Sequence, residues 1–333
     1  MPLRLFLLLA GLALLAWVIA RQGPAEILAL VREVGWGVVP IAAVYAGYQS
    51  LRAGALWLCL PDRKAVSYKR TLAVRVSGEA VQFLTATGPF LAEPTKAWLL
   101  VREGLSGPEG FAATIAEYLV NILLGSVLLA GATLWLLASY PLGGPLAAVA
   151  GVLATTSVVF LAVAAVAIHR RIYLIGAVLR GVRALPVVGR RLRPDADAIR
   201  RFEDRLLEIL RGDPWRVGRV ALLQAAGQLL LVVELWWILR LSGFAVPPSL
   251  ALLAECAAKF VSLAFFFIPA QLGASEGAMA VIVETLGLPA AAGVAAALVR
   301  RARSLLVSAV GLTALSLLSA VRGSQSPPPV AGN

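Results

Sequence analysis

Two glutamates in this sequence follow proline and glycine residues inside stretches that are otherwise apolar. Glu276 follows Pro269 and Gly273, and Glu93 follows Pro89. Proline and glycine interrupt helices, and an interrupted backbone is tolerated within a lipid bilayer only where protein or a water-filled cavity covers it. An ionisable side chain at such a break is a candidate for binding a polar ligand or carrying a proton.

Other charged side chains lie in apolar sequence close to these two. Each costs ~2.5–3.5 kcal/mol at the centre of a membrane helix unless it is paired or hydrated, so a cluster of them indicates a buried polar site. We expect this site to bind substrate or to couple a proton to its movement, and we expect no catalytic residue in it. The candidates are Glu93, Lys96, Glu117, Glu276, Arg300, Arg301, Arg303, Arg75 and Glu79, with breaks in the backbone at Gly88, Pro89, Pro269, Gly273 and Gly277.

The charged candidates also have structural interpretations. Glu93 and Glu276 would each stabilise the start of the half-helix that follows, because the helix dipole favours a negative charge there. Glu255 and Lys259 are four residues apart, which predicts an ion pair on one helix. For the two glutamates at the breaks, a functional and a structural role both stay open.

Arg300, Arg301 and Arg303 lie in the last apolar stretch, at a depth where an arginine must face protein or water. A guanidinium group binds phosphate through two parallel hydrogen bonds, so these residues suit a phosphate-bearing head group. Pairing with Glu276 or Glu284 is the structural alternative.

A match to one enzyme motif carries little weight. Gly273, Ser275 and Gly277 have the spacing of a hydrolase nucleophile elbow, but that motif needs a strand, a turn and a histidine base. His169 is the only histidine, and neither it nor the two cysteines has the neighbours of a metal site. We therefore expect no enzyme, no cofactor and no metal.

The composition indicates an integral membrane protein. The chain has 333 residues, of which 60% are hydrophobic, and its mean hydropathy is +0.85. The first apolar run resembles a signal peptide but is long enough to be an uncleaved helix, which we favour. The expected spans are 3–20, 36–60, 110–138, 145–168, 215–241 and 289–321, with broken hairpins at 71–102 and 249–286.

Arginines concentrate in one polar segment, residues 169–214, and the net charge of the chain is +12. An excess of lysine and arginine marks the cytoplasmic side, so we place this basic loop inside the cell. It contains a predicted amphipathic surface helix and serves as a topology signal or, alternatively, binds anionic lipid. We expect no nucleic acid as a partner.

The two broken hairpins have related sequences. The fixed offset that superposes Glu93 on Glu276 also superposes Glu117 on Arg300. Counting spans from the basic loop, the first hairpin enters from the cytoplasm and the second from outside. We therefore predict an all-α polytopic membrane protein with inverted repeats and two broken, re-entrant helical hairpins, as in secondary transporters. Their tips should approach each other near the bilayer midplane.

We expect one transmembrane domain, residues 1–321. Repeat A covers about 36–168 and repeat B about 215–321, with the basic loop between them. Residues 322–333 are rich in proline, serine and glycine and are expected to be a disordered tail.

Three groups of residues have the spacing of motifs from a known family. They are Arg75, Gly78, Glu79, Val81, Gly88, Pro89, Ala92 and Glu93; Pro269, Leu272, Gly273, Glu276 and Gly277; and Leu298, Arg300, Arg301, Arg303 and Leu305. These groups resemble the motifs of the flippase-like transmembrane region of lysylphosphatidylglycerol synthases. The nearest branch is the free-standing, hopanoid-associated one, and the resemblance covers about residues 30–320.

The resemblance implies movement of a lipid, of phospholipid, polyprenyl-phosphate or hopanoid type, across or out of the bacterial inner membrane. The lysyl-transferring branch carries a soluble catalytic domain after its membrane region. This chain ends soon after its last helix, so we expect no aminoacyl transfer from it. A membrane scaffold or accessory subunit of a lipid-synthesis complex is the alternative function, and a second copy of the chain is an alternative partner.

Overall fold

The computed structural model describes residues 20, 24–85, 88–139, 144–170, 196–264 and 271–320. All regular secondary structure in these residues is helical, which confirms the all-α prediction. Residues 3–19 of the predicted first span, Pro269 and the tail 322–333 lie outside the described residues. Five helical stretches are long and apolar enough to cross a membrane: Pro24–Cys59, Gly107–Trp135, Ala150–His169, Pro214–Leu241 and Ala290–Ala320.

The first half of the chain alternates long and short helices. Ser67 caps one of the short helices, because its Oγ accepts a hydrogen bond from Arg70 N at 3.4 Å. The elements are α2 (Pro24–Val34), a 3₁₀ turn (Gly35–Gly37), α3 (Val38–Cys59), α4 (Tyr68–Leu84), α5 (Pro89–Arg102), α6 (Gly107–Ser139) and α7 (Gly144–His169).

The second half repeats this alternation. Asp213 caps the first long helix by accepting a hydrogen bond from Trp215 N at 2.9 Å. The elements are α9 (Ala196–Arg211), α10 (Pro214–Leu241), α11 (Pro248–Ala264), α12 (Ala274–Thr285) and α13 (Ala290–Ala320). The last of these is one continuous helix, in agreement with the predicted span 289–321.

The predicted break at Gly88 separates α4 from α5. Gly88 has a φ of +48°, and Pro89 is the first residue of α5. Gly273 likewise precedes α12, with a φ of +75°. Gly277 is not a break: it lies in the first turn of α12, where its N–H donates to Gly273 O at 2.9 Å. A glycine at this position continues the helix, because it needs no unusual backbone angle there.

The short helices α5 and α12 end in the same way. Gly104 and Gly287 follow them with φ values of +109° and +87°, the left-handed conformation in which glycine commonly ends a helix. The offset that superposes Glu93 on Glu276 also superposes these two glycines. The same offset superposes the backbone hydrogen bonds at the two helix C-termini, from Leu105 N to Leu100 O at 3.3 Å and from Leu288 N to Val283 O at 3.1 Å.

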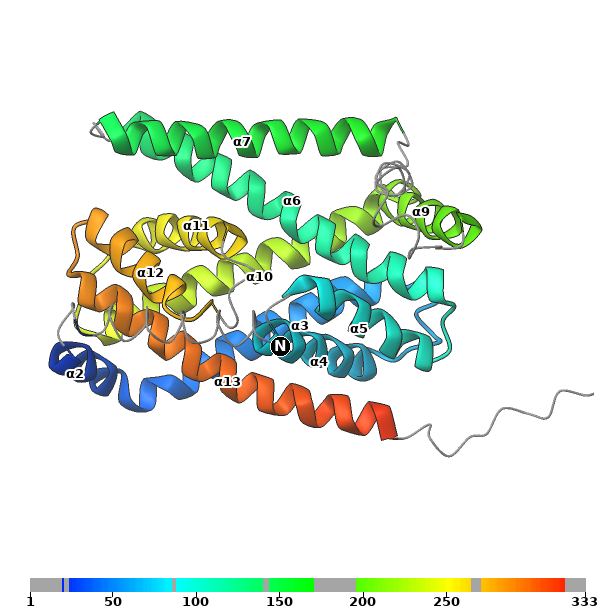
Figure 1. The fold of residues 1–333 in the computed structure, drawn as a ribbon, viewed down its shortest axis with the longest axis horizontal. Coiled ribbons are helices and arrows are strands. Elements are labelled where there is room, and N and C mark those ends of the chain that lie inside the picture. The colour runs from blue at the N-terminus through cyan, green and yellow to red at the C-terminus, as the bar shows by residue number, and fades with distance from the viewer. Residues whose placement is uncertain are drawn as a thin grey trace, which may run out of the picture.

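Figure 1 shows how the two halves are arranged along the long axis of the molecule. The helix pair α4–α5 lies in one half of the molecule, and the pair α11–α12 lies in the other. The long helices α6, α10 and α13 extend across both halves. Helix α2 lies at one end against α13, whereas α9 lies at the other end against α6.

The predicted amphipathic helix in the basic segment is α9. Its residues Leu206 and Ile209 are buried in a hydrophobic cluster with Leu58 of α3 and Val120 of α6. The apolar face of α9 therefore packs on protein. Helix α7 packs mainly on α6 and exposes apolar side chains such as Phe160, as expected for a surface that faces lipid.

Candidate functional site

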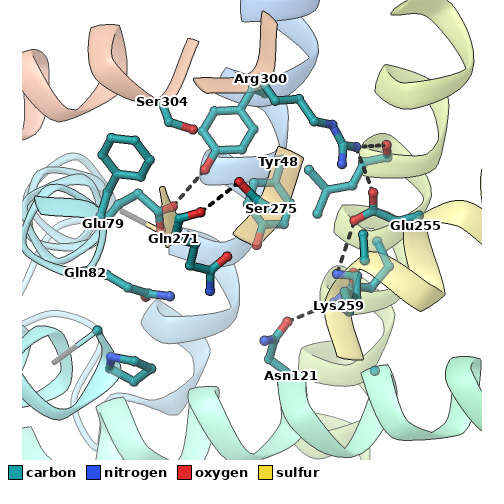
Figure 2. Close-up of a pocket in the computed structure, with 18 of the residues that line it drawn as sticks. Tyr48, Glu79, Gln82, Asn121, Glu255, Lys259, Gln271, Ser275, Arg300 and Ser304 are labelled. Atoms are coloured by element: carbon teal, nitrogen blue, oxygen red, sulfur yellow. Dashed lines mark hydrogen bonds and ion pairs between the residues drawn. The ribbon is translucent and has the colours of Figure 1, made fainter. Parts of the chain in front are cut away.

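A cavity of about 450 Å³ lies where both helix pairs meet the long helices. Gly88 at the first break lines it, and so do Gln271 and Ser275 at the second. Figure 2 shows Glu79 on one side of this cavity, with Gln271 and Ser275 near its centre. Glu255 lies on the opposite side. A break in a helix is stable within a membrane when the exposed backbone groups line a polar cavity inside the protein.

Glu117 of α6 is the centre of a buried group of charges beside the cavity. It is 0% exposed. Arg52 of α3 donates from Nε to Glu117 Oε1 at 2.8 Å, and Gln224 of α10 donates to the same oxygen at 2.7 Å. Lys96 Nζ lies 3.3 Å from the other carboxylate oxygen. The second cationic partner and the amide compensate for the removal of this carboxylate from water.

Lys96 also pairs with Glu93, with 2.8 Å between Nζ and Oε1. The lysine side chain crosses α4 at Gly78, where a Cβ atom would lie 2.4 Å from Lys96 Cγ. Glu93 therefore has a cationic partner on its own helix. The other carboxylate oxygen of Glu93, Oε2, is buried and accepts no hydrogen bond from the described residues. Glu93 belongs to an ion-pair network and does not cap the helix.

Glu276 does cap its helix. Gly273 N donates to Glu276 Oε2 at 2.9 Å, and Ser275 Oγ donates to the same oxygen at 2.9 Å. Arg301 Nε donates to Glu276 Oε1 at 2.6 Å. The structural role that the sequence left open for this glutamate is thus present, together with an arginine partner from α13.

Arg300 and Arg303 pair with carboxylates other than the expected ones. Arg300 Nη2 lies 2.7 Å from Glu255 Oε2 and 3.4 Å from Glu234 Oε2. Arg303 pairs with Glu234 and covers the ring of Tyr45, 3.5 Å from its centroid. The alternative pairing with Glu276 or Glu284 is therefore present for Arg301 but wrong for Arg300 and Arg303, whose side chains lie toward α10 and α11.

Two ion pairs face the cavity from the short helices. Arg75 Nη2 lies 2.9 Å from Glu79 Oε2, and Tyr45 donates to the same carboxylate at 2.8 Å. On α11 the predicted pair of Glu255 and Lys259 is present, with 3.7 Å between Nζ and Oε1. The structure therefore brings seven of the nine charged candidates to the cavity or into an ion pair with a charge that lines it, whereas Lys96 and Glu93 connect to it only through Glu117.

Sequence reasoning did not select several polar residues that complete this network. Arg52, Gln224 and Glu234 are buried within long apolar helices and bind the selected charges. Their signal in the sequence was a polar side chain inside a membrane span. The described residues contain no group of three or more His, Cys, Asp and Glu side chains that could hold a metal ion.

These features define a polytopic helical membrane protein with a charged internal cavity. The sequence pattern of the lysylphosphatidylglycerol synthase TM region matches residues 4–311, and the chain belongs to that family. No curated protein and no solved structure matches the chain.

Proposed function

We propose that this protein is a transporter that moves a lipid across or out of the bacterial cytoplasmic membrane and catalyses no chemical reaction on it. The observation that carries this proposal is the cavity at the meeting point of the two helix pairs. It is lined by paired charges, which can hold a polar head group inside the membrane.

The arrangement of the short helices supports the same proposal, and we infer from it that the two halves are inverted repeats. Helices α5 and α12 have 14 and 12 residues and are too short to span a membrane, and the pairs α4–α5 and α11–α12 lie in opposite halves of the molecule (Figure 1). We infer that they are re-entrant hairpins that enter from opposite faces. In secondary transporters such hairpins bind substrate near the midplane, and one repeat moves against the other to alternate access.

A membrane scaffold for a lipid-synthesis complex is the second candidate function. The extensive pairing of the buried charges favours it, because a rigid interior suits a scaffold that never changes shape. A scaffold would not depend on an open cavity, and the experiment uses this difference.

Gly125 offers a way to fill the cavity. It lines the cavity on α6, and a Cβ atom added there meets nothing within 4 Å. We expect Gly125→Trp to fold normally but to lose transport of fluorescent phospholipid in reconstituted vesicles, measured by dithionite quenching. Gly131→Trp is the matched control: it is on the same helix with open space around its Cβ atom, and Gly131 does not line the cavity. Undiminished transport by Gly125→Trp, or none by the wild type, would contradict the proposal.

A further inference from the structure

We propose that the cavity selects a lipid whose phosphate head group carries a net negative charge, and that Lys259 and Asn121 contact that phosphate. This inference rests on the proposed transport function and specifies its substrate. It is carried by three observations: the charge balance around the cavity, the exposure of Lys259, and the direction of a short hydrogen-bond chain.

The charges that line the cavity or connect to it through ion pairs do not cancel. Among the described residues, seven of these side chains are cationic and six are carboxylates. Residues 86–87 and 265–270 at the two breaks contain no charged side chain that could restore the balance. The cations are Arg52, Arg75, Lys96, Lys259, Arg300, Arg301 and Arg303, and the carboxylates are Glu79, Glu93, Glu117, Glu234, Glu255 and Glu276. An uncompensated positive charge in a low-dielectric site attracts one negative charge.

Lys259 is the cation of this set that is most available to a ligand. Its side chain is 29% exposed, whereas the side chain of Lys96 is 0% exposed. Its ion pair with Glu255 is also long, at 3.7 Å. A lysine ammonium has three donors, so the hydrogen bond to Gln228 and the contact with Glu255 leave one for a ligand in the cavity.

The hydrogen bonds of Lys259 fix the orientation of two amides. Because an ammonium group can only donate, the atom of Gln228 that it contacts must be the carbonyl oxygen. Gln228 Nε2 then donates to Asn121 Oδ1 at 3.0 Å. This turns the amide nitrogen of Asn121, with its N–H donors, toward the cavity that Asn121 lines. Lysine and asparagine together present donors and positive charge, a combination that recognises an anionic oxygen (Figure 2).

The size and position of the cavity favour a lipid as the source of this phosphate. A volume of about 450 Å³ accommodates a head group but not the acyl chains of a phospholipid. Asn121 and Gly125 of α6 line the cavity together with Glu255 and Lys259 of α11. In this proposal the acyl chains leave the cavity between these two helices. An aminoacylated lipid with a cationic head group would be repelled by the same charges.

The test compares three fluorescent lipids in vesicles that contain the wild-type protein: anionic phosphatidylglycerol, zwitterionic phosphatidylcholine and cationic lysylphosphatidylglycerol. We expect phosphatidylglycerol to move about tenfold faster than the other two. Lys259→Gln should remove most of this preference, and Lys259→Arg should retain it. Arg205→Gln, which removes an exposed cation of α9, is the matched control and should change nothing.

A second variant addresses the case in which Lys259→Gln does not fold. Asn121→Asp keeps the size of the side chain but replaces its amide donors with a carboxylate, and it should also slow phosphatidylglycerol. Protein-dependent uptake of inorganic phosphate into the vesicles, with no preference among the three lipids, would overturn the lipid assignment and indicate a soluble phosphate ligand. Equal rates for all three lipids would refute the proposed selectivity but not the transport function. If the protein moved none of the three lipids, the proposed function itself would be refuted.

Discussion

The helices before and after the basic segment carry equivalent ion pairs with the signs of the charges reversed. Helices α4 and α11 are both 17 residues long. Aligned end to end, they superpose Arg75 on Glu255 and Glu79 on Lys259. Both helices thus place an ion pair at the same two positions, with 2.9 Å between the charged atoms on α4 and 3.7 Å on α11.

The long helices show the same reversal. The offset that superposes Glu93 on Glu276 places Glu117 on Arg300. Aligning the last residue of α3, Cys59, with the last residue of α10, Leu241, places Arg52 on Glu234. Arg52 pairs with Glu117, and Glu234 pairs with Arg300. Each half thus has an ion pair between the two long helices that flank its pair of short helices, and the signs of the charges are exchanged between the halves.

One difference between the halves concerns how closely the helices approach. Helix α13 meets α4 at Gly311, where a Cβ atom would lie 2.3 Å from Val76 O. The same alignments place Leu128 at the position of Gly311 and Cys256 at that of Val76. Leu128 packs against an α6–α11 cluster that contains Cys256. A leucine does not allow the close backbone approach that Gly311 allows in the other half.

The largest effect is expected from removing the charge of Glu117. Glu117→Gln leaves Arg52 and Lys96 buried with less compensation, so the free energy of unfolding should fall by about 3–5 kcal/mol. The measurement is unfolding of the purified protein by detergent titration. Glu208→Gln on the exposed face of α9 is the control and should change little. A loss equal to that of the control would mean that the ion pairs of the first half contribute nothing.

Gly311→Leu should make the contact of α13 with α4 resemble that of α6 with α11. The new side chain cannot fit against Val76 O, so α13 must move away from α4, and we expect a loss of about 3 kcal/mol. The same titration measures it. Gly131→Leu on α6, where a Cβ atom meets nothing within 4 Å, is the control and should cost far less. If both variants unfold at the same detergent fraction, the close contact at Gly311 does not distinguish the halves.

Much of the helical framework could be predicted from the sequence, because its signals are local. Apolar runs of span length predicted α6, α7 and α10, and glycine and proline predicted the break at Gly88. The error at Gly277 arose because glycine is also compatible with a first helical turn. The partners of Arg300 and Arg303 could not be predicted, since they depend on which helices pack together.

Exchanging the charges of the first half tests whether its sign is free. Arg52→Glu combined with Glu117→Arg reproduces the order of charges in Glu234 and Arg300. Lys96 would face the new arginine, so we expect the double variant to recover only part of the loss caused by Glu117→Arg alone. Adding Lys96→Met, which matches Met279 of the second half, should recover about 2 kcal/mol more. If the triple variant recovers none of the lost free energy of unfolding, residues other than these three determine which helix carries the negative charge.

The smallest effect is expected at Gly78, where the halves differ by one methyl group. The alignment of α4 with α11 places Gly78 on Ala258, and the offset of α5 and α12 places Lys96 on Met279. Gly78 is needed in the first half because Lys96 crosses it on the way to Glu117, leaving 2.4 Å between an added Cβ atom and Lys96 Cγ. The obstacle is a flexible side chain, so Gly78→Ala should cost only about 1 kcal/mol.

The reason for that cost can be tested separately. If the lysine is the obstacle, Gly78→Ala should become neutral or stabilising in a Lys96→Met background, because alanine is the better helix former and methionine adapts to the added methyl group. The two single variants and the double variant form a cycle whose coupling free energy, from detergent unfolding, should be about 1 kcal/mol. Additive losses would mean that Gly78 serves the packing of α4 on another helix, and the pairing of Gly78 with Lys96 would not explain why the first half has a glycine at this position.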